Sequence, residues 1–195
     1  MSERVRHAQE VLQRADVVCF DFDSTISPHE CIDELARLHG VVDAVASLTR
    51  SAMEGGSSFS STLKLRLELI QPTKDSITQL GSKLLATNPF VFEFIQSLIQ
   101  RGTRVFIVSG GFEDAIWPCA NLLQIPPECV FANRILYDKD GKYAGFDMER
   151  PTSRDDGKSI AIRAIRQQTN AHSLVIIGDG ASDLDAAGEA HAFIG

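Results

Sequence analysis

Short apolar segments of strand type, separated by helical patterns, constrain the fold of this chain more than any other feature. The strand-type segments lie at 17–20, 104–108, 129–131, 174–177 and 192–194, and helical patterns such as 90–101 and 157–168 lie between most of them. Strands that alternate with helices form right-handed crossovers and a parallel sheet covered on both faces. The sequence therefore predicts an α/β fold, a Rossmann-like parallel sheet with helices on both faces. One segment, 135–146, instead predicts a β-hairpin with a tight turn at Asp140-Gly141.

A long helical block follows the first predicted strand. Residues 28–83 carry no strand signal and contain four helical patterns, at 29–39, 42–53, 58–70 and 74–86. An insertion at this point lies at the C-terminal edge of the sheet, which is where ligands bind in open α/β folds. We therefore expect a core formed by residues 1–27 and 84–195, and a small helical cap, residues 28–83, that acts as a lid over this edge.

Composition and charge exclude several classes of function. The 195 residues carry a net charge of -7, which argues against binding of nucleic acid or of an anionic membrane surface. No apolar run is long enough to span a bilayer, and the N-terminal residues lack the apolar region of a secretory signal. The four cysteines form no CxxC pair, so packed, reduced thiols are expected. These features predict a soluble cytoplasmic protein.

Two aspartates follow the first predicted strand. Asp21 and Asp23 come directly after an apolar run that ends at Phe20, and side chains two residues apart on a strand point to the same face. Two like charges at the end of a buried strand cost desolvation energy and raise each other's pKa unless a cation lies between them. Stability alone does not favour this pair, so both residues are candidates for a functional site.

Polar residues follow two further predicted strands at the same edge. Ser109-Gly110-Gly111 offers a hydroxyl and accessible backbone N–H groups to an anion, although alone it is equally typical of an ordinary strand-to-helix turn. Asp179 and Asp183 follow the 174–177 strand, where a turn and a helix cap are the alternative reading. Together the four aspartates form a hard-oxygen site suited to Mg²⁺. Lys158, at the start of a predicted helix, either adds a fixed cation at this edge or is simply solvated.

Four motifs of this chain resemble those of the haloacid dehalogenase superfamily of phosphotransferases. They are DFDST at 21–25, SGG at 109–111, Lys158 and GDGASD at 178–183. Other stretches, among them ECIDELA, AMEGGSSF, RLELIQP and FANR, are similar to the phosphoserine phosphatase family within that superfamily. The four motifs alone imply a phosphotransferase with one of many substrates, and the lid stretches imply O-phosphoserine. The implied reaction is Mg²⁺-dependent hydrolysis of O-phospho-L-serine, the last step of serine biosynthesis.

The resemblance also implies catalytic roles. Asp21 would attack phosphorus and form an aspartyl-phosphate, which splits one very slow step into two, and Asp23 would act as general acid and then as general base. Asp21, the backbone carbonyl of Asp23 and Asp179 would hold Mg²⁺, with Asp183 orienting metal-bound water and Lys158. Ser109 and Lys158, together with the Gly110 N–H, would hold the phosphoryl oxygens in the transition state. The residues expected to bind substrate are Glu30, Met53, Phe59, Arg66, Ser109, Gly110, Lys158 and Ser182.

Arg66 is also singled out by its own helix. Phe59, Leu63 and Ile70 form an apolar stripe in the 58–70 pattern, and Arg66 projects from the middle of it. A buried guanidinium is costly without an anionic partner. Arg66 therefore pairs with a substrate group or with an acid of the lid, or it extends to water. The resemblance assigns it to the substrate carboxylate, assigns Glu30 to the substrate ammonium group, and makes Met53 and Phe59 shape the pocket, although both could equally be lid core.

Three features depart from the resembled family. Glu54 stands where some relatives have a small residue, which affects the expected width and charge of the pocket. Pro118 falls inside the helix expected after the SGG motif, so this helix either begins later or kinks. The family continues beyond the 192–194 strand, so an edge that ends at Gly195 is expected to expose apolar surface and unpaired backbone.

Other functions remain open at this point. The chain could be a phosphatase of another small phosphomonoester, although the pocket residues speak against this. It could also be a catalytically weak form that binds Mg²⁺ and phosphoserine, or a domain that merely accepts phosphate on Asp21. Homodimers occur among relatives, so a homodimer is a further expectation.

Overall fold

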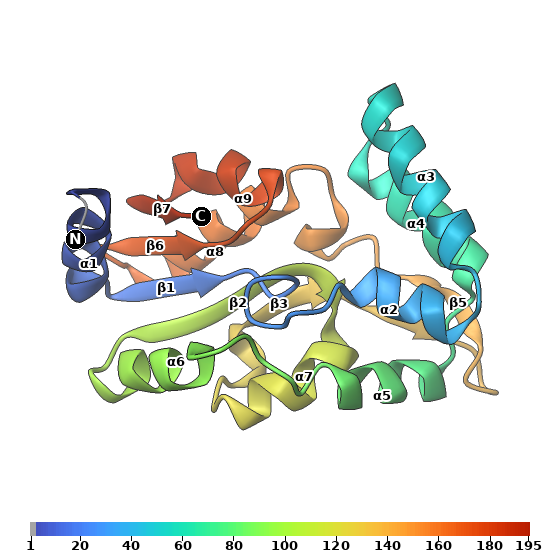
Figure 1. Cartoon of the computed structure of the whole chain (residues 1–195), viewed down its shortest axis with the longest axis horizontal. Coiled ribbons are helices and arrows are strands. Elements are labelled where there is room, and N and C mark those ends of the chain that lie inside the picture. The colour runs from blue at the N-terminus through green and yellow to red at the C-terminus, as the bar shows by residue number, and fades with distance from the viewer. Residues whose placement is uncertain (1–2) are drawn as a thin grey trace.

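A five-stranded parallel sheet forms the centre of the protein (Figure 1). The computed structural model describes residues 3–195, without the side chains of residues 4 and 53–55. The strands are β1 (Val17–Phe20), β2 (Arg104–Phe112), β3 (Val130–Asn133), β6 (Leu174–Ile177) and β7 (Ala192–Ile194), in the order β3-β2-β1-β6-β7. All neighbouring pairs are parallel, as a sheet built from right-handed crossovers requires. The predicted fold class is confirmed.

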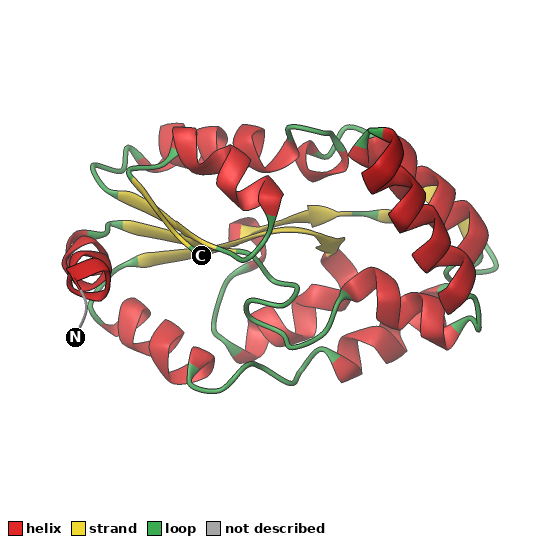
Figure 2. Cartoon of the chain, turned by 45° about the horizontal axis from the view of Figure 1, so that its top comes forward, coloured by secondary structure: helices red, strands yellow, loops and turns green. Residues whose placement is uncertain are grey.

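Helices cover both faces of the sheet (Figure 2). Helices α6 (Val91–Gln100) and α7 (Glu113–Leu122) lie on one face, and α8 (Gly157–Thr169) and α9 (Ala181–Ala186) lie on the other. Helix α1 (Glu3–Arg14) lies near the N-terminal ends of the strands. Short 3₁₀ turns complete the core. They are η1 (Pro127–Cys129), η2 (Pro151–Ser153) and η3 (Ala187–Glu189).

The alternation of side chains along β1 explains why this strand is apolar throughout. Val18 and Phe20 pack into the larger hydrophobic cluster, beneath α6 and α7, whereas Val17 and Cys19 pack into a second cluster together with α8. The ring of Phe20 meets that of Phe94 edge-on, with centroids 5.9 Å apart. A strand that is buried on both faces reads as a continuous hydrophobic run, and β1 is such a strand.

Four helices follow β1, as the sequence predicts. They are α2 (Cys31–Leu38), α3 (Val42–Gly55), α4 (Phe59–Ile70) and α5 (Lys74–Lys83). Helix α4 begins where the hydroxyl of Ser58 accepts from the Ser61 N–H, and α5 begins at a capping box between Thr73 and Ser76. Helices α3 and α4 form a pair that projects beyond the C-terminal edge of the sheet (Figure 1). The predicted division into a core and a cap at 28–83 stays a prediction.

Helix α5 lies along α7 of the core. A Cβ at Gly81 of α5 would come within 3.2 Å of the Pro118 ring and 3.3 Å of the Ala115 carbonyl, so the glycine permits this close approach. Helix α7 begins at Glu113, directly after β2, and Pro118 lies inside it, so the alternative of a later start is excluded. On the other side of α5, Lys83 forms an ion pair with the buried Glu34 of α2.

Strand β2 is longer than predicted. The sequence predicts a strand at 104–108, but β2 continues through the Ser109–Gly111 turn to Phe112. The strand can resume because the register with β3 shifts between Val108 and Phe112, where a β-bulge accommodates the extra residues. The glycine-rich segment is therefore held within the sheet rather than in a free loop.

The predicted hairpin at 135–146 is confirmed. Strands β4 (Ile135–Tyr137) and β5 (Tyr143–Phe146) pair antiparallel, and Gly141 adopts the positive φ of +75° that its turn requires. The carbonyl of Gly141 also accepts from the N–H of Lys74, so the hairpin tip touches the start of α5.

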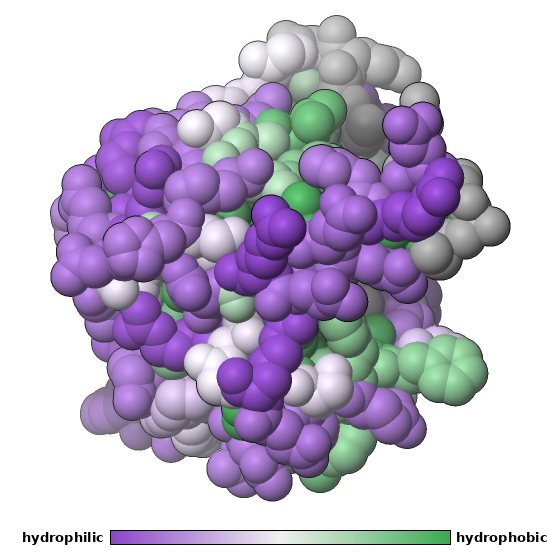
Figure 3. All heavy atoms as spheres, turned by 90° about the vertical axis from the view of Figure 1, so that its left-hand side faces the viewer, coloured by the Kyte–Doolittle hydropathy of each residue, from purple (hydrophilic) through white to green (hydrophobic). Residues whose placement is uncertain are grey.

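Strand β7 is an edge strand of the sheet, and an apolar groove lies beside it. The groove has a volume of about 570 Å³ and runs between α1 and β7, at the end of the molecule that Figure 3 shows. Its apolar lining includes Ala8, Val11, Phe193 and Ile194. Within residues 3–195, no helix is both long and apolar enough to cross a membrane.

Candidate active site

A pocket of about 220 Å³ lies at the C-terminal ends of β1, β2 and β6, under the α3–α4 pair. Most of the residues predicted to act at the site line it. They are Asp21, Asp23, Glu30, Phe59, Arg66, Gly110, Lys158, Asp179 and Ser182. These positions are far apart in the sequence, and the order of the strands brings them together at one edge, where α/β folds bind ligands.

Asp21 and Lys158 form a buried ion pair at the base of the pocket. Lys158 Nζ lies 2.8 Å from Asp21 Oδ2, and the two side chains are 11% and 9% exposed. Asp21 is held by its backbone N–H, which donates to the Ile177 carbonyl of β6, and its Oδ1 accepts from the Phe22 N–H at 2.7 Å. Burial raises the pKa of Asp21, although the nearby ammonium opposes this effect. The Asp21 carboxylate is therefore fixed in direction.

Lys158 also pairs with Asp183, again at 2.8 Å. Burial alone would lower the pKa of Lys158, but the carboxylates of Asp21 and Asp183 raise it above its ordinary value, so the ammonium keeps its charge. Asp183 is 2% exposed, and its Oδ2 accepts from the Gly180 N–H at 3.2 Å. Asp183 does not line the pocket. It contacts Lys158 from the side away from the pocket, and its orienting role stays a prediction.

The carboxylate of Asp23 points to the start of α2. Its Oδ1 accepts from the N–H of Cys31 at 3.2 Å, and a helix N-terminus favours an anion at this position. Even so, burial raises the pKa of Asp23 to about 7. Strand β1 ends at Phe20, so strand alternation does not govern Asp21 and Asp23, but both still line the same pocket. A carboxyl group with a pKa near neutrality suits general acid and base chemistry.

Two of the predicted metal ligands, Asp21 and Asp179, line the same pocket. Asp179 is exposed at the pocket, and its Oδ1 accepts from the Thr25 hydroxyl at 3.0 Å. Among the described residues, no three carboxylate, imidazole or thiolate groups gather closely enough to enclose a metal. Mg²⁺ needs no such enclosure, because it binds one or two carboxylates and retains waters or substrate oxygens. Asp21 and Asp179 fit a cation of this kind.

The Ser109–Gly111 segment presents backbone rather than side chain to the pocket. Gly110 and Gly111 line it, whereas Ser109 is fully buried (0% exposed), and its Oγ accepts from the Gly111 N–H at 2.9 Å. A Cβ at Gly110 would lie 3.4 Å from the Phe59 ring of the lid. The absence of a side chain at Gly110 therefore lets the Phe59 ring pack directly against the Ser109–Gly111 segment, which is called the cradle below.

Two charged side chains of the inserted helices face this pocket. Arg66 of α4 donates through Nε to the Thr62 carbonyl at 3.3 Å, and it forms no ion pair within the described part of the chain. Burial lowers the pKa of Arg66, and the charges of Asp33 and Glu30 partly offset this. Glu30 is exposed at the pocket rim and accepts from the hydroxyl of Ser24, a residue with a positive φ of +56°. A ligand with one anionic and one cationic group could pair the anion with Arg66 and the cation with Glu30.

The predictions for Met53 and Glu54 fall on side chains outside the described residues. Conversely, four residues line the pocket that were not among the predicted site residues. They are Ile32, Leu63, Gly111 and Gly180. The two glycines belong to the SGG and GDG motifs, which could have suggested them. Ile32 and Leu63 carry the same pattern as ordinary helix core, so the sequence holds no signal that would separate them from it.

The parallel sheet and the aspartates at its C-terminal edge define an α/β protein with a carboxylate-lined pocket. A family model of haloacid dehalogenase-like hydrolases matches residues 18–188, and the chain belongs to this family, as its motifs predict. Phosphatases of the family are generally metal-dependent. A phosphoserine phosphatase from Homo sapiens is 42% identical over 182 residues, which are 93% of this chain and 81% of the relative.

Two further relatives point to the same enzyme class. A phosphoserine phosphatase from Drosophila melanogaster is 43% identical over 190 residues, 96% of this chain and 70% of the relative. A solved structure described as a phospho-aspartyl intermediate analogue of phosphoserine phosphatase is 30% identical, with a TM-score of 0.74, and covers 91% of this chain and 84% of that one.

Proposed function

We propose that this chain is a phosphoserine phosphatase, which hydrolyses O-phospho-L-serine to L-serine and phosphate. The observation that carries the proposal is one pocket that holds Asp21, Arg66 and Glu30 together. Arg66 offers a bidentate partner to the substrate carboxylate, and Glu30 offers an anion to its ammonium group. The identity to phosphoserine phosphatases over most of the chain supports the same substrate.

Each residue of the site has a separate role in the reaction. Asp21, fixed by Lys158 and by the Phe22 N–H, attacks phosphorus, and the bond from phosphorus to the serine oxygen breaks. Asp23 donates its proton to that oxygen, which its raised pKa permits near neutral pH. In the second half, Asp23 takes a proton from water as the water attacks the aspartyl-phosphate, and phosphate leaves. Lys158 and the backbone of Gly110 offset the negative charge of the phosphoryl oxygens.

Mg²⁺ is the metal we assign to Asp21 and Asp179. The donor set supports this choice, because both are hard carboxylate oxygens at the rim of a pocket that is to receive phosphate. When bound, the ion neutralises the charge of the phosphoryl group and thereby reduces its repulsion from the attacking carboxylate. A cytoplasmic location and a homodimer stay predictions.

The test is phosphate release from substrates that lack one group at a time. O-phospho-L-serine is compared with phosphoethanolamine, which lacks the carboxylate, and with 3-phosphoglycerate, which lacks the ammonium group, each with Mg²⁺ and with EDTA. Preference for phosphoserine that EDTA abolishes supports the proposal. Release only from another phosphomonoester, or none from the folded chain, contradicts it.

Arg66 provides a second arm of the same test. In Arg66→Ala, KM for phosphoserine is expected to rise at least about tenfold, because one charge-assisted bidentate pair is worth about 1.5–3 kcal/mol. Activity on phosphoethanolamine should be nearly unchanged. Lys64→Ala is the matched control, since Lys64 is a cation on the same helix whose side chain is 62% exposed. An equal loss on both substrates would contradict the assignment of Arg66 to the carboxylate.

A further inference from the structure

Asn133, at the end of β3, lies directly behind the Ser109–Gly111 cradle. Its side chain is fully buried (0% exposed) and uses both ends of its amide. Nδ2 donates to the Gly110 carbonyl at 2.8 Å, and Oδ1 accepts from the Thr152 hydroxyl at 3.1 Å. Because a carbonyl can only accept a hydrogen bond, the chemistry of these partners fixes which end of the amide faces Gly110.

The β-bulge in β2 explains why this contact is needed. Val108 pairs with Phe131 and Phe112 pairs with Asn133, so three residues of β2 face only Ala132 of β3. The peptide groups of these three residues leave the regular ladder and must find other partners. Asn133 supplies one of them, for the Gly110 carbonyl, from a side chain instead of the backbone.

The same peptide group also determines the direction of the Ser109 hydroxyl. The Gly110 carbonyl and the Gly111 N–H belong to one planar unit, so fixing one end fixes the other. Asn133 holds the carbonyl end, and the N–H end donates to Ser109 Oγ at 2.9 Å. A hydroxyl that accepts this bond retains its own hydrogen for another acceptor. Ser109 itself does not line the pocket, so this hydrogen is assigned to a phosphoryl oxygen on the resemblance of the SGG motif alone.

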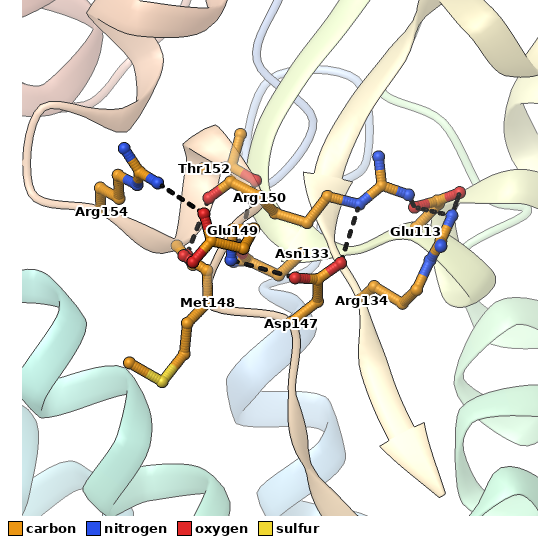
Figure 4. A network of polar contacts seen from close by, with 10 residues as sticks. Glu113, Asn133, Arg134, Asp147, Met148, Glu149, Arg150, Thr152 and Arg154 are labelled. Carbon is orange, nitrogen blue, oxygen red and sulfur yellow. Dashed lines mark hydrogen bonds and ion pairs between the residues drawn. The ribbon is translucent and has the colours of Figure 1, made fainter.

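Beyond Asn133, the contacts reach the segment that carries the catalytic lysine. Thr152 lies in η2, and the Pro151 carbonyl of the same turn packs against Gly157, next to Lys158. Figure 4 shows Asn133 and Thr152 beside a wider polar network, in which Arg150 pairs with Glu113 at the start of α7. The ion pairs of this network join Arg134, which follows β3, and Arg150, which precedes η2, to Glu113 of α7.

We propose that Asn133 is a positioning residue of the reaction. Through the Gly110–Gly111 peptide it sets the position of the Ser109 hydroxyl, and through Thr152 it ties the phosphate cradle to the segment that leads to Lys158. Asn133 does not line the pocket, so its effect is indirect. This inference rests on the proposed function, because it assigns the cradle to the phosphoryl group.

The experiment compares Asn133→Ala, Ser109→Ala and the double variant. In Asn133→Ala, kcat on phosphoserine is expected to fall about ten- to a hundredfold, because a misplaced group loses transition-state stabilisation, while KM changes much less. If Asn133 acts through Ser109, the double variant loses at most about twofold more than Ser109→Ala alone. An unchanged kcat in Asn133→Ala, or losses that multiply in the double variant, would overturn the inference.

Two controls separate positioning from stability. Val130→Ala removes buried volume from the same strand at a position that pairs with Ile107, so it should lower the Tm and leave kcat of the folded protein unchanged. Thr152→Ser keeps the hydroxyl and should keep kcat, whereas Thr152→Val removes the donor and should reduce it. The two Thr152 variants also test the inference if Asn133→Ala does not fold. Equal kcat values for Thr152→Ser and Thr152→Val would overturn it.

The wild-type chain distinguishes this inference from the proposed function. If the wild type releases no phosphate from phosphoserine, the proposed function fails. Binding of inorganic phosphate, measured by calorimetry, then tests the inference. Asn133→Ala must weaken this binding if the inference is right, and unchanged binding would show that the inference is wrong. If the wild type is active and Asn133→Ala is equally active, only the inference fails.

Discussion

The backbone N–H of Ser60, in the first turn of lid helix α4, donates to Oδ1 of Asp155, which lies three residues before Lys158 (2.9 Å). A carboxylate at a helix N-terminus satisfies an otherwise unpaired donor and interacts favourably with the helix dipole. This bond joins the helix that carries Arg66 to the loop that leads into α8, the helix that carries Lys158. It therefore ties the start of α4 to the core beside the pocket.

Loss of this bond is expected to weaken substrate binding more than chemistry. In Asp155→Ala the lid is free to open, so KM for phosphoserine should rise by roughly three- to tenfold, which corresponds to about 1 kcal/mol for one cap interaction. Asp156→Ala is the matched control, because its side chain forms no cap bond with α8. The measurement is the steady-state KM of the wild type, Asp155→Ala and Asp156→Ala. Equal KM values would show that the bond does not hold the lid.

Lys158 is expected to serve both stability and catalysis. Lys158→Met leaves the carboxylates of Asp21 and Asp183 buried without their cation, and breaking such a pair costs about 3–5 kcal/mol. The Tm should therefore fall, and it should fall less at pH 5 than at pH 8, because protonation of a carboxylate removes the unpaired charge. The kcat should decrease at least about a hundredfold. A variant with normal kcat would contradict the position of Lys158 at the reacting group.

The raised pKa of Asp23 predicts how stability depends on pH in EDTA. The pKa of Asp23 rises from 3.8 in its ordinary state to about 7 in the folded protein, because of burial. Between these values the folded chain binds more protons than the unfolded chain, so this contribution to stability is complete below about pH 4 and is lost as the pH rises through 7. The Tm of the wild type should therefore fall across this window relative to Asp23→Asn, which cannot ionise.

The measurement is the difference in Tm between these two proteins at each pH. Taking the difference is necessary because other carboxylates act with the opposite sign. Burial would raise the pKa of Glu34, but its ion pairs with Arg37 and Lys83 lower it, so Glu34 stabilises the fold as the pH rises through the acidic range. A constant difference between pH 4 and pH 7 would show that Asp23 titrates normally.

Gly157 is expected to be intolerant of any side chain. A Cβ there would lie 2.3 Å from the Pro151 carbonyl and 2.9 Å from Thr152 Cα, and both are backbone atoms that cannot rotate away. Gly157→Ala should therefore lower the Tm, by about 2–4 °C for each kcal/mol lost in a chain of this size, and displace Lys158 so that kcat falls. Gly188→Ala is the control, because a Cβ at Gly188 would meet nothing within 4 Å. Equal Tm values for the two variants would contradict the prediction.

The sequence predicts the fold and much of the pocket because both depend on local patterns. The apolar run before Asp21 predicts a buried strand, and the helical periods predict the inserted helices. Asp21 and Asp23 are found because two like charges at the end of a buried strand are unfavourable, and Asp179 and Asp183 because they follow a second strand at the same edge. The two acids nearest to Lys158 nevertheless differ in place, since Asp21 lines the pocket and Asp183 lies behind it.

Features that depend on contacts between distant segments cannot be predicted from local sequence patterns. The β-bulge that extends β2 to Phe112 arises from its register with β3, which no local pattern in the SGG segment encodes. For the same reason Asn133 reads as an ordinary strand-end asparagine, and Asp155 as one of several loop acids. Ser109 is predicted as a direct phosphate ligand, but its burial and its bond to the Gly111 N–H become visible only in three dimensions.

The strand order has a consequence for how the site comes into being during folding. Strand β1 pairs with β2 on one side and with β6 on the other, although these partners begin 87 and 157 residues further along the chain (104 - 17 and 174 - 17). Contacts of such long sequence separation form late and cooperatively, since loop closure must precede them. No partly folded intermediate that lacks either partner can carry out the reaction. Recovery of activity during refolding therefore reports completion of the whole sheet.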